Sequence, residues 1–261
     1  MKISTAALVS GAVVAALATG TGHATSAAPP TASGPGHPCA QPGPYPLPHG
    51  GEPVRLDPAD FTTRIDHPYW PMRPGTTWRY VERGGGEVAT VRVTVTRRTK
   101  VIESVRARVV HDVVRVDGEV VEDTRDWYAQ DSGGSLWYLG ELSRSYEDGR
   151  FVGTEGSWMH GRDGAQAGVI LPAHLSAGCR YREEHLAGEA EDRARILSTR
   201  ETLRTPTGLH HDVVQTANTT PLEPDVLENK FYAPGIGPVL ELDLSPERGS
   251  AVLTRVTHRA P

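Results

Sequence analysis

The sequence contains few lysines and none of the common catalytic motifs. After Lys2 the lysines are Lys100 and Lys230, so the basic residues are almost all arginine; we attribute this to a GC-rich genome. The motifs HExxH, CxxC, GxSxG, GxGxxG and the P-loop are absent. The sequence therefore gives no support for the common zinc enzymes, serine hydrolases or nucleotide-binding enzymes, and it names no cofactor or metal.

An excess of positive charge is also missing. The formal net charge is -5 at pH 7, from 27 Lys and Arg against 32 Asp and Glu. Proteins that bind nucleic acids or anionic lipids rely on a basic surface. We therefore expect neither a nucleic-acid partner nor electrostatic attachment to a membrane.

Long apolar runs do not occur after the N-terminus. Residues 6–17 are apolar apart from Ser10 and Gly11, and they lie between the positive charge of Lys2 and a stretch of small residues. This order is typical of a secretory signal peptide, which we place at residues 1–28, and the run is too short to span a membrane. We expect a secreted, extracellular protein without a transmembrane segment after signal cleavage.

The remaining chain divides into a leader and one domain. Residues 29–53 are rich in Pro, Gly, Ala and His, a composition that cannot bury enough apolar surface to offset chain entropy. We expect them to form a disordered leader. Residues 54–261 contain no second linker of this kind, so we predict a single β-rich domain.

Cysteine is scarce, with Cys39 in the leader and Cys179 in the domain. An even number of cysteines in an exported protein favours a disulfide, which would tie the leader to the domain. Two free thiols are the alternative, although no neighbouring residue would activate them.

The pattern of apolar residues predicts strands rather than helices. Val91, Val93 and Val95 alternate with polar residues, which is the period of a β-strand. Residues 122–141 contain two Trp-Tyr pairs on either side of a Ser-Gly-Gly turn, which indicates a β-hairpin. We predict an antiparallel meander that forms a curved half-barrel or barrel with very little helix. The Gly and Pro residues of 159–178 predict a long loop, which we consider a candidate lid.

The strongest group of chemically active residues lies in 181–192. On a strand, Glu183 and His185 would share one face, and after a turn Glu189 and Glu191 would share a face of the next strand. Carboxylates and an imidazole in this arrangement could bind a divalent cation or act as an acid and a base. A solvated face with cross-strand charge pairs is the alternative.

Two further groups are candidates. Glu155 and His160 lead into the Gly-rich loop, where they could line a site or simply be exposed. The large aromatic residues could line an apolar ligand cavity or pack as an ordinary core. The aromatic candidates are Trp127, Tyr128, Trp137, Tyr138, Trp158 and Tyr232.

Three segments carry a resemblance to a known family. They are Pro71–Tyr80 (pattern PxxPGTTWxY), Asp126–Asp131 (DWYAQD) and Phe231–Val239, which contains YAPGIGxV. With them the chain resembles a family of secreted bacterial β-domains of actinobacterial type. The resemblance implies export, a sheet-rich fold and a distant likeness to lipoprotein-carrier half-barrels. It brings no catalytic residues.

These observations lead to three hypotheses. The first is a secreted β-domain that binds an apolar or amphiphilic small ligand in a curved-sheet cavity. The second is an extracellular enzyme that uses the carboxylate and histidine group, with or without a metal. The third is a cell-surface interaction module, which would expose an apolar patch.

Overall fold

The computed structural model describes residues 38–258. The predicted signal peptide and residues 29–37 of the predicted leader lie outside this range. The described chain is mainly antiparallel β-sheet, which confirms the predicted fold class. Its one helical element is the 3-10 turn η1 (Pro58–Asp60), capped by the Asp57 side chain, which accepts a hydrogen bond from the Ala59 N–H. No helix in this range has the length and hydropathy needed to cross a membrane.

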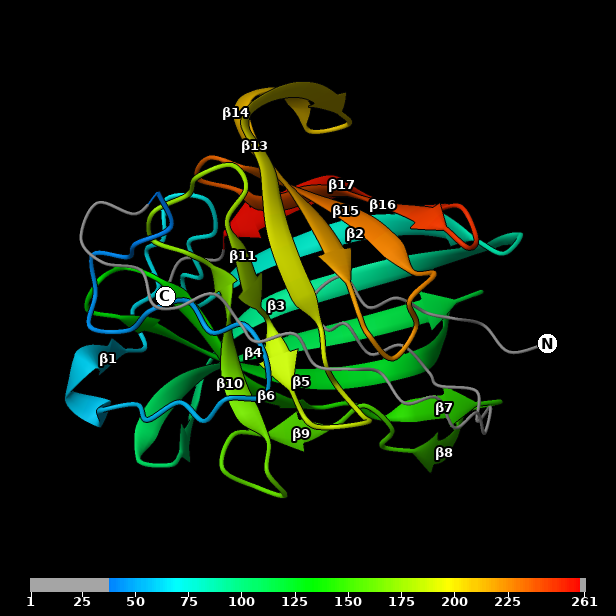
Figure 1. Ribbon diagram of the computed structural model, residues 1–261. Coiled ribbons are helices and arrows are strands. Elements are labelled where there is room, and N and C mark those ends of the chain that lie inside the picture. The colour runs from blue at the N-terminus through cyan, green and yellow to red at the C-terminus, as the bar shows by residue number, and fades with distance from the viewer. Residues whose placement is uncertain (1–37, 259–261) are drawn as a thin grey trace.

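The strands follow one another mainly as an up-and-down meander (Figure 1). In chain order they are β1 (Phe61–Thr62), β2 (Thr76–Gly84), β3 (Glu87–Ile102), β4 (Val105–Val116), β5 (Glu119–Asp131), β6 (Leu136–Leu142), β7 (Ser145–Glu147), β8 (Arg150–Gly153), β9 (Trp158–Met159), β10 (Gln166–Leu171), β11 (Arg180–Arg182), β12 (Glu184–His185), β13 (Arg193–Thr205), β14 (Gly208–Thr219), β15 (Leu227–Ala233), β16 (Gly237–Ser245) and β17 (Gly249–His258).

The sheet curves into a nearly closed barrel. Strands β2 to β6 pair in sequence, β6 pairs with β10, and β10 pairs with β12. Strand β11 pairs with β13, after which β13 to β17 pair in sequence and β17 returns to β2. Figure 1 shows the resulting curvature, with β13 and β15 in front of β3 to β5. Alternate residues of each strand therefore face a shared interior.

Aromatic side chains fill one part of this interior. Trp70, in the loop before β2, contacts Trp78 of β2, Tyr128 of β5 and Tyr232 of β15 at ring-centroid distances of 6.0 to 6.4 Å. Because these partners belong to opposite walls, Trp70 packs between the walls. All four side chains are at most 2% exposed.

The described part of the predicted leader is ordered. Residues 38–53 pack against the domain, where Leu47 is 7% exposed and the Pro48 carbonyl accepts a 2.7 Å hydrogen bond from the Arg182 N–H. The predicted disulfide between Cys39 and Cys179 is present. Composition alone did not reveal this packing, because it depends on a covalent bond and on contacts with distant strands.

The segment predicted as a long loop contains a buried strand. Strand β10 lies within residues 159–178, and its residues 167–171 are buried between β6 and β12. The apolar run of this strand is short, and the Gly and Pro residues around it led to the prediction of a loop. Because β10 is part of the barrel wall, it does not serve as the lid that the sequence suggested.

Candidate functional site

The second part of the barrel interior is lined by carboxylates. On β5 the inward positions are Glu122, Thr124 and Asp126, which are at most 8% exposed, whereas Asp123 and Arg125 between them face outward and form an ion pair at 3.0 Å. Across the sheet, Glu141 of β6 pairs in register with Asp126. The strand period therefore places acidic side chains inside the barrel rather than on its surface.

We call this set the interior carboxylates. They come from all sides of the sheet and interact electrostatically with one another. The set comprises Glu82, Asp112, Glu122, Asp126, Glu141, Glu183, Glu184, Asp192, Glu228, Glu241 and Asp243.

Among the described residues, Lys230 is the basic side chain that lies within this set. Its ammonium group is 3.9 Å from the Glu228 carboxylate, and its side chain is 7% exposed. Burial alone would lower the pKa of Lys230, but the nearby charges of Glu241, Glu228 and Glu183 raise it well above its ordinary value. Lys230 is therefore a fixed positive charge that offsets only part of the negative charge around it.

Burial shifts several of these carboxylates toward their protonated forms. It raises the pKa of Glu184 and of Glu82 to about 8 and that of Glu122 to about 7, with further contributions from neighbouring carboxylates. The pKa values of Asp112 and Glu241 lie well above the ordinary range for the same two reasons. Such groups can exchange a proton near neutral pH, and they release it when a cation compensates their charge.

A bulge between β11 and β12 changes which residues face inward. The N–H groups of Glu183 and Glu184 both point to the Asp192 carbonyl, at 2.8 and 3.4 Å, so two residues oppose one. Both carboxylates consequently enter the interior, where Glu183 accepts a 2.6 Å hydrogen bond from Asn218 and Glu184 accepts one of 2.6 Å from the Trp158 indole N–H. The prediction that Glu183 and His185 share one strand face is therefore wrong. The bulge interrupts the alternation, and the His185 side chain points away from Glu183 toward Gly51.

The other residues of the predicted group lie outside the interior. Glu189 is exposed in the turn between Leu186 and Ala190. Glu191 accepts a 3.0 Å hydrogen bond from the Gly188 N–H and lies 3.8 Å from Arg193. Of the four residues that the sequence grouped here, the structure places Glu183 among the interior carboxylates.

Glu155 and His160 are not brought together. Glu155 is exposed, whereas His160 is 6% exposed and accepts a 3.2 Å hydrogen bond from the Ala167 N–H through Nδ1. Burial lowers the pKa of His160, which keeps its ring neutral and suited to this structural contact.

The aromatic candidates lie on both faces of the sheet. Tyr138 stacks on Tyr128 at 4.8 Å and contacts Trp158 edge-on at 5.2 Å, so these rings pack against one another in the interior, as Tyr232 does against Trp70. On the outer face, Trp137 donates a 2.9 Å hydrogen bond to Asp131, and the Lys100 ammonium lies 3.5 Å from the ring centroid of Trp127. The six aromatics therefore do not line one surface.

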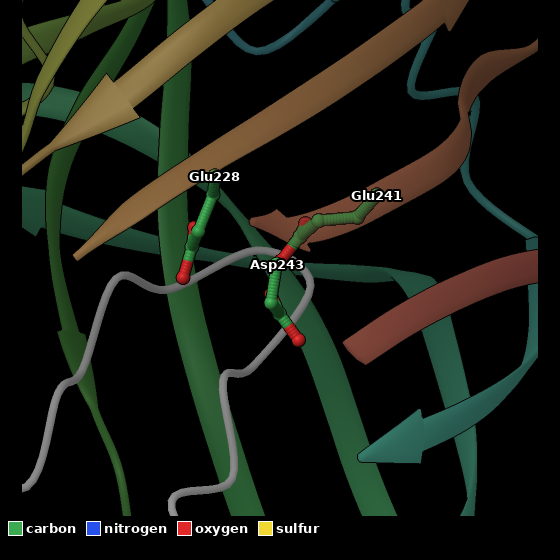
Figure 2. Close-up of side chains that lie close together, drawn as sticks. All are labelled: Glu228, Glu241 and Asp243. Carbon is green, nitrogen blue, oxygen red and sulfur yellow. The ribbon is translucent and has the colours of Figure 1, made fainter. Parts of the chain in front are cut away.

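Two adjacent strands hold three of the carboxylates close together (Figure 2). Glu228 of β15 lies directly opposite Asp243 of β16, and Lys230 lies opposite Glu241. One carboxylate oxygen each of Glu228, Glu241 and Asp243 lies within 4.8 Å of the others, and Figure 2 shows all three groups on the same side of the strands. Oxygen ligands at this spacing suit a hard divalent cation.

Sequence reasoning missed most of this site for one reason. The spacing of Glu228 and Lys230 in the sequence predicts that they share a strand face, where an ordinary surface ion pair is the usual interpretation. The structure corrects this interpretation, because both side chains are largely buried. Period two identifies residues on one face but does not tell which face becomes the barrel interior.

Comparisons with known proteins add two similar structures. No family model matches the chain, and no curated protein matches it. A protein from Bacteroides fragilis, described as exported and of YmcC-like fold, is 13% identical with a TM-score of 0.39. A lipoprotein from Parabacteroides distasonis is 12% identical with a TM-score of 0.39, and each match covers 72% of this chain and 98% of the other. Similarity at this level carries no information on activity.

Proposed function

We propose that this protein binds a positively charged small ligand among the interior carboxylates of its barrel. The observation that supports the proposal is the imbalance of charge in the described interior, where many carboxylates surround Lys230. Buried charges are ordinarily paired, because an uncompensated one costs several kcal/mol of solvation. A cationic ligand would restore the balance and would select the ionised state of these groups.

An apolar ligand is less well supported. The interior aromatic rings contact one another and Trp70, as a packed core does. An amphiphilic ligand remains compatible with the proposal only if its polar group is a cation that reaches the carboxylates.

Binding would take place outside the cytoplasm. The Cys39–Cys179 disulfide fits an oxidising compartment, and it agrees with the signal peptide expected from the sequence. We therefore propose a secreted binding protein.

Thermal unfolding with added cations tests the proposal. We would add spermidine or calcium chloride to the purified secreted protein at constant ionic strength, with sodium sulfate as the anion control. A ligand at one hundred times its Kd stabilises by about 2.7 kcal/mol. For a domain of this size we expect a rise in Tm of roughly 5–10 °C.

Charge-removing variants identify where the cation binds. The double variant Asp112→Asn/Glu184→Gln removes two ionisable interior carboxylates and should weaken spermidine binding at least about tenfold, whereas the exposed control Glu189→Gln should bind spermidine like the wild type. Equal spermidine effects on all three proteins, or no effect of either cation on the wild type, would refute the proposed function.

A further inference from the structure

We infer that Glu228, Glu241 and Asp243 form a binding site for one divalent metal cation, with Ca²⁺ as the best fit. This inference rests on the proposed function and specifies the ligand at one place in the interior. We call these residues the carboxylate triad (Figure 2).

The register of β15 and β16 is the first support. Glu228 lies directly opposite Asp243, and like charges in that position destabilise a sheet. The neighbouring pair, Lys230 opposite Glu241, carries opposite charges. A cation between Glu228 and Asp243 would convert the repulsive pair into two attractive contacts.

Glu241 supplies an independent observation. Its side chain is 2% exposed, and its Oε2 atom has no hydrogen-bond partner among the described residues. A buried carboxylate oxygen without a partner forfeits its solvation, so a ligand that accepts its lone pairs is favoured. Figure 2 shows the Glu241 carboxylate reaching toward Asp243.

The neighbouring strand leaves room for Asp243 to take part. Gly249 of β17 pairs with Asp243, and a Cβ atom at position 249 would overlap the Asp243 carboxylate. The absence of a side chain at Gly249 therefore permits the orientation in which Asp243 lies near the other two carboxylates.

Charge and spacing define the class of ion. Three ionised carboxylates and Lys230 sum to about two negative charges, which a divalent cation neutralises. Oxygen ligands on opposite sides of Ca²⁺ lie roughly 4.6–5.2 Å apart, given Ca–O distances of about 2.3–2.6 Å. That range is the largest separation that two ligands of one Ca²⁺ ion can have, and the triad oxygens, all within 4.8 Å of one another, are close enough to share one ion. Ca²⁺ also tolerates irregular geometry better than Mg²⁺ does.

Isothermal titration calorimetry of the secreted protein with calcium chloride tests the inference. We expect one Ca²⁺ per chain in the wild type and in the exposed control Glu189→Gln. Glu241→Gln and Asp243→Asn should each weaken Ca²⁺ binding by more than about tenfold, because each removes one ligand charge. Gly249→Ala should weaken it as well by displacing the Asp243 carboxylate, and thermal unfolding without Ca²⁺ would verify that each variant is folded.

A parallel titration with spermidine separates this inference from the proposed function. Loss of Ca²⁺ binding in the triad variants, with the control unaffected, supports the site. Spermidine binding without Ca²⁺ binding would overturn the metal site and leave the proposed function standing. If neither cation binds the wild type, both proposals fail.

Discussion

Glu122 shows how the barrel interior changes the chemistry of a single residue. Its carboxylate is 8% exposed and accepts a 2.8 Å hydrogen bond from the Thr124 hydroxyl. Burial is the main cause that raises its pKa to about 7 from an ordinary value of 4.5. The folded protein therefore retains a proton that the unfolded chain loses at lower pH.

The stability of the protein should depend on pH through this residue. The contribution of Glu122 to the free energy of unfolding is fully present below pH 4.5 and is lost as pH rises toward about 7. In that window the carboxyl ionises in the unfolded chain but stays protonated in the folded protein, so rising pH favours the unfolded state. The loss amounts to about 3 kcal/mol, at 1.4 kcal/mol per pKa unit.

The variant Glu122→Gln removes this loss while keeping an oxygen that can accept from Thr124. In urea unfolding with chelator present, we expect the variant to exceed the wild type in stability at pH 8 by about 3 kcal/mol. At pH 4 the two proteins should be nearly equal. The same stability difference at both pH values would contradict the raised pKa.

At the scale of elements, β10 and the bulge between β11 and β12 are closely packed. A Cβ atom at Gly168 of β10 would collide with the Glu183 backbone carbonyl, so only glycine fits there. By contrast, a Cβ atom at Gly153 of β8 would meet nothing within 4 Å.

Two glycine substitutions test this packing. Gly168→Ala should destabilise the protein by about 3 kcal/mol, because the backbone of β10 or of the bulge at Glu183 must shift. Gly153→Ala is the matched control and should change the free energy of unfolding by no more than about 0.5 kcal/mol. Similar losses for both variants in urea unfolding would show that the close approach at Gly168 is absent.

The same elements show how far sequence reasoning reaches. Alternation and turn residues predicted the antiparallel meander, because those signals are local to each strand. The bulge at Glu183 was not predictable, since it depends on Asp192 and on β10 pairing beside it. One extra residue there exchanged His185 for Glu184 in the interior, and a local pattern cannot report that exchange.

At the scale of the molecule, distant contacts close the barrel. Strand β2 pairs with β17, and Cys39 bonds to Cys179 across 140 residues of sequence. No local signal specifies the strand closure, whereas the even cysteine count predicted the disulfide. Which strand faces become interior, and therefore the acidic site itself, follows from this closure.

The disulfide should contribute to global stability. The double variant Cys39→Ala/Cys179→Ala should lose about 2–5 kcal/mol in the free energy of unfolding, because the unfolded chain regains the freedom of a long loop. Urea unfolding of both proteins under non-reducing conditions measures the loss. An unchanged midpoint would mean that the segment before β1 holds its position without the covalent bond.

The central claim is that the acidic interior holds a cation, and native mass spectrometry of the purified protein tests it most directly. We predict a native mass above the denatured, non-reduced mass, by tens of daltons for a metal ion that a chelator removes or by more for an organic cation. Added Ca²⁺ or spermidine should restore that excess in the wild type, and spermidine should restore less of it in Asp112→Asn/Glu184→Gln. A native mass equal to the denatured mass, unchanged by either added cation, would contradict the account.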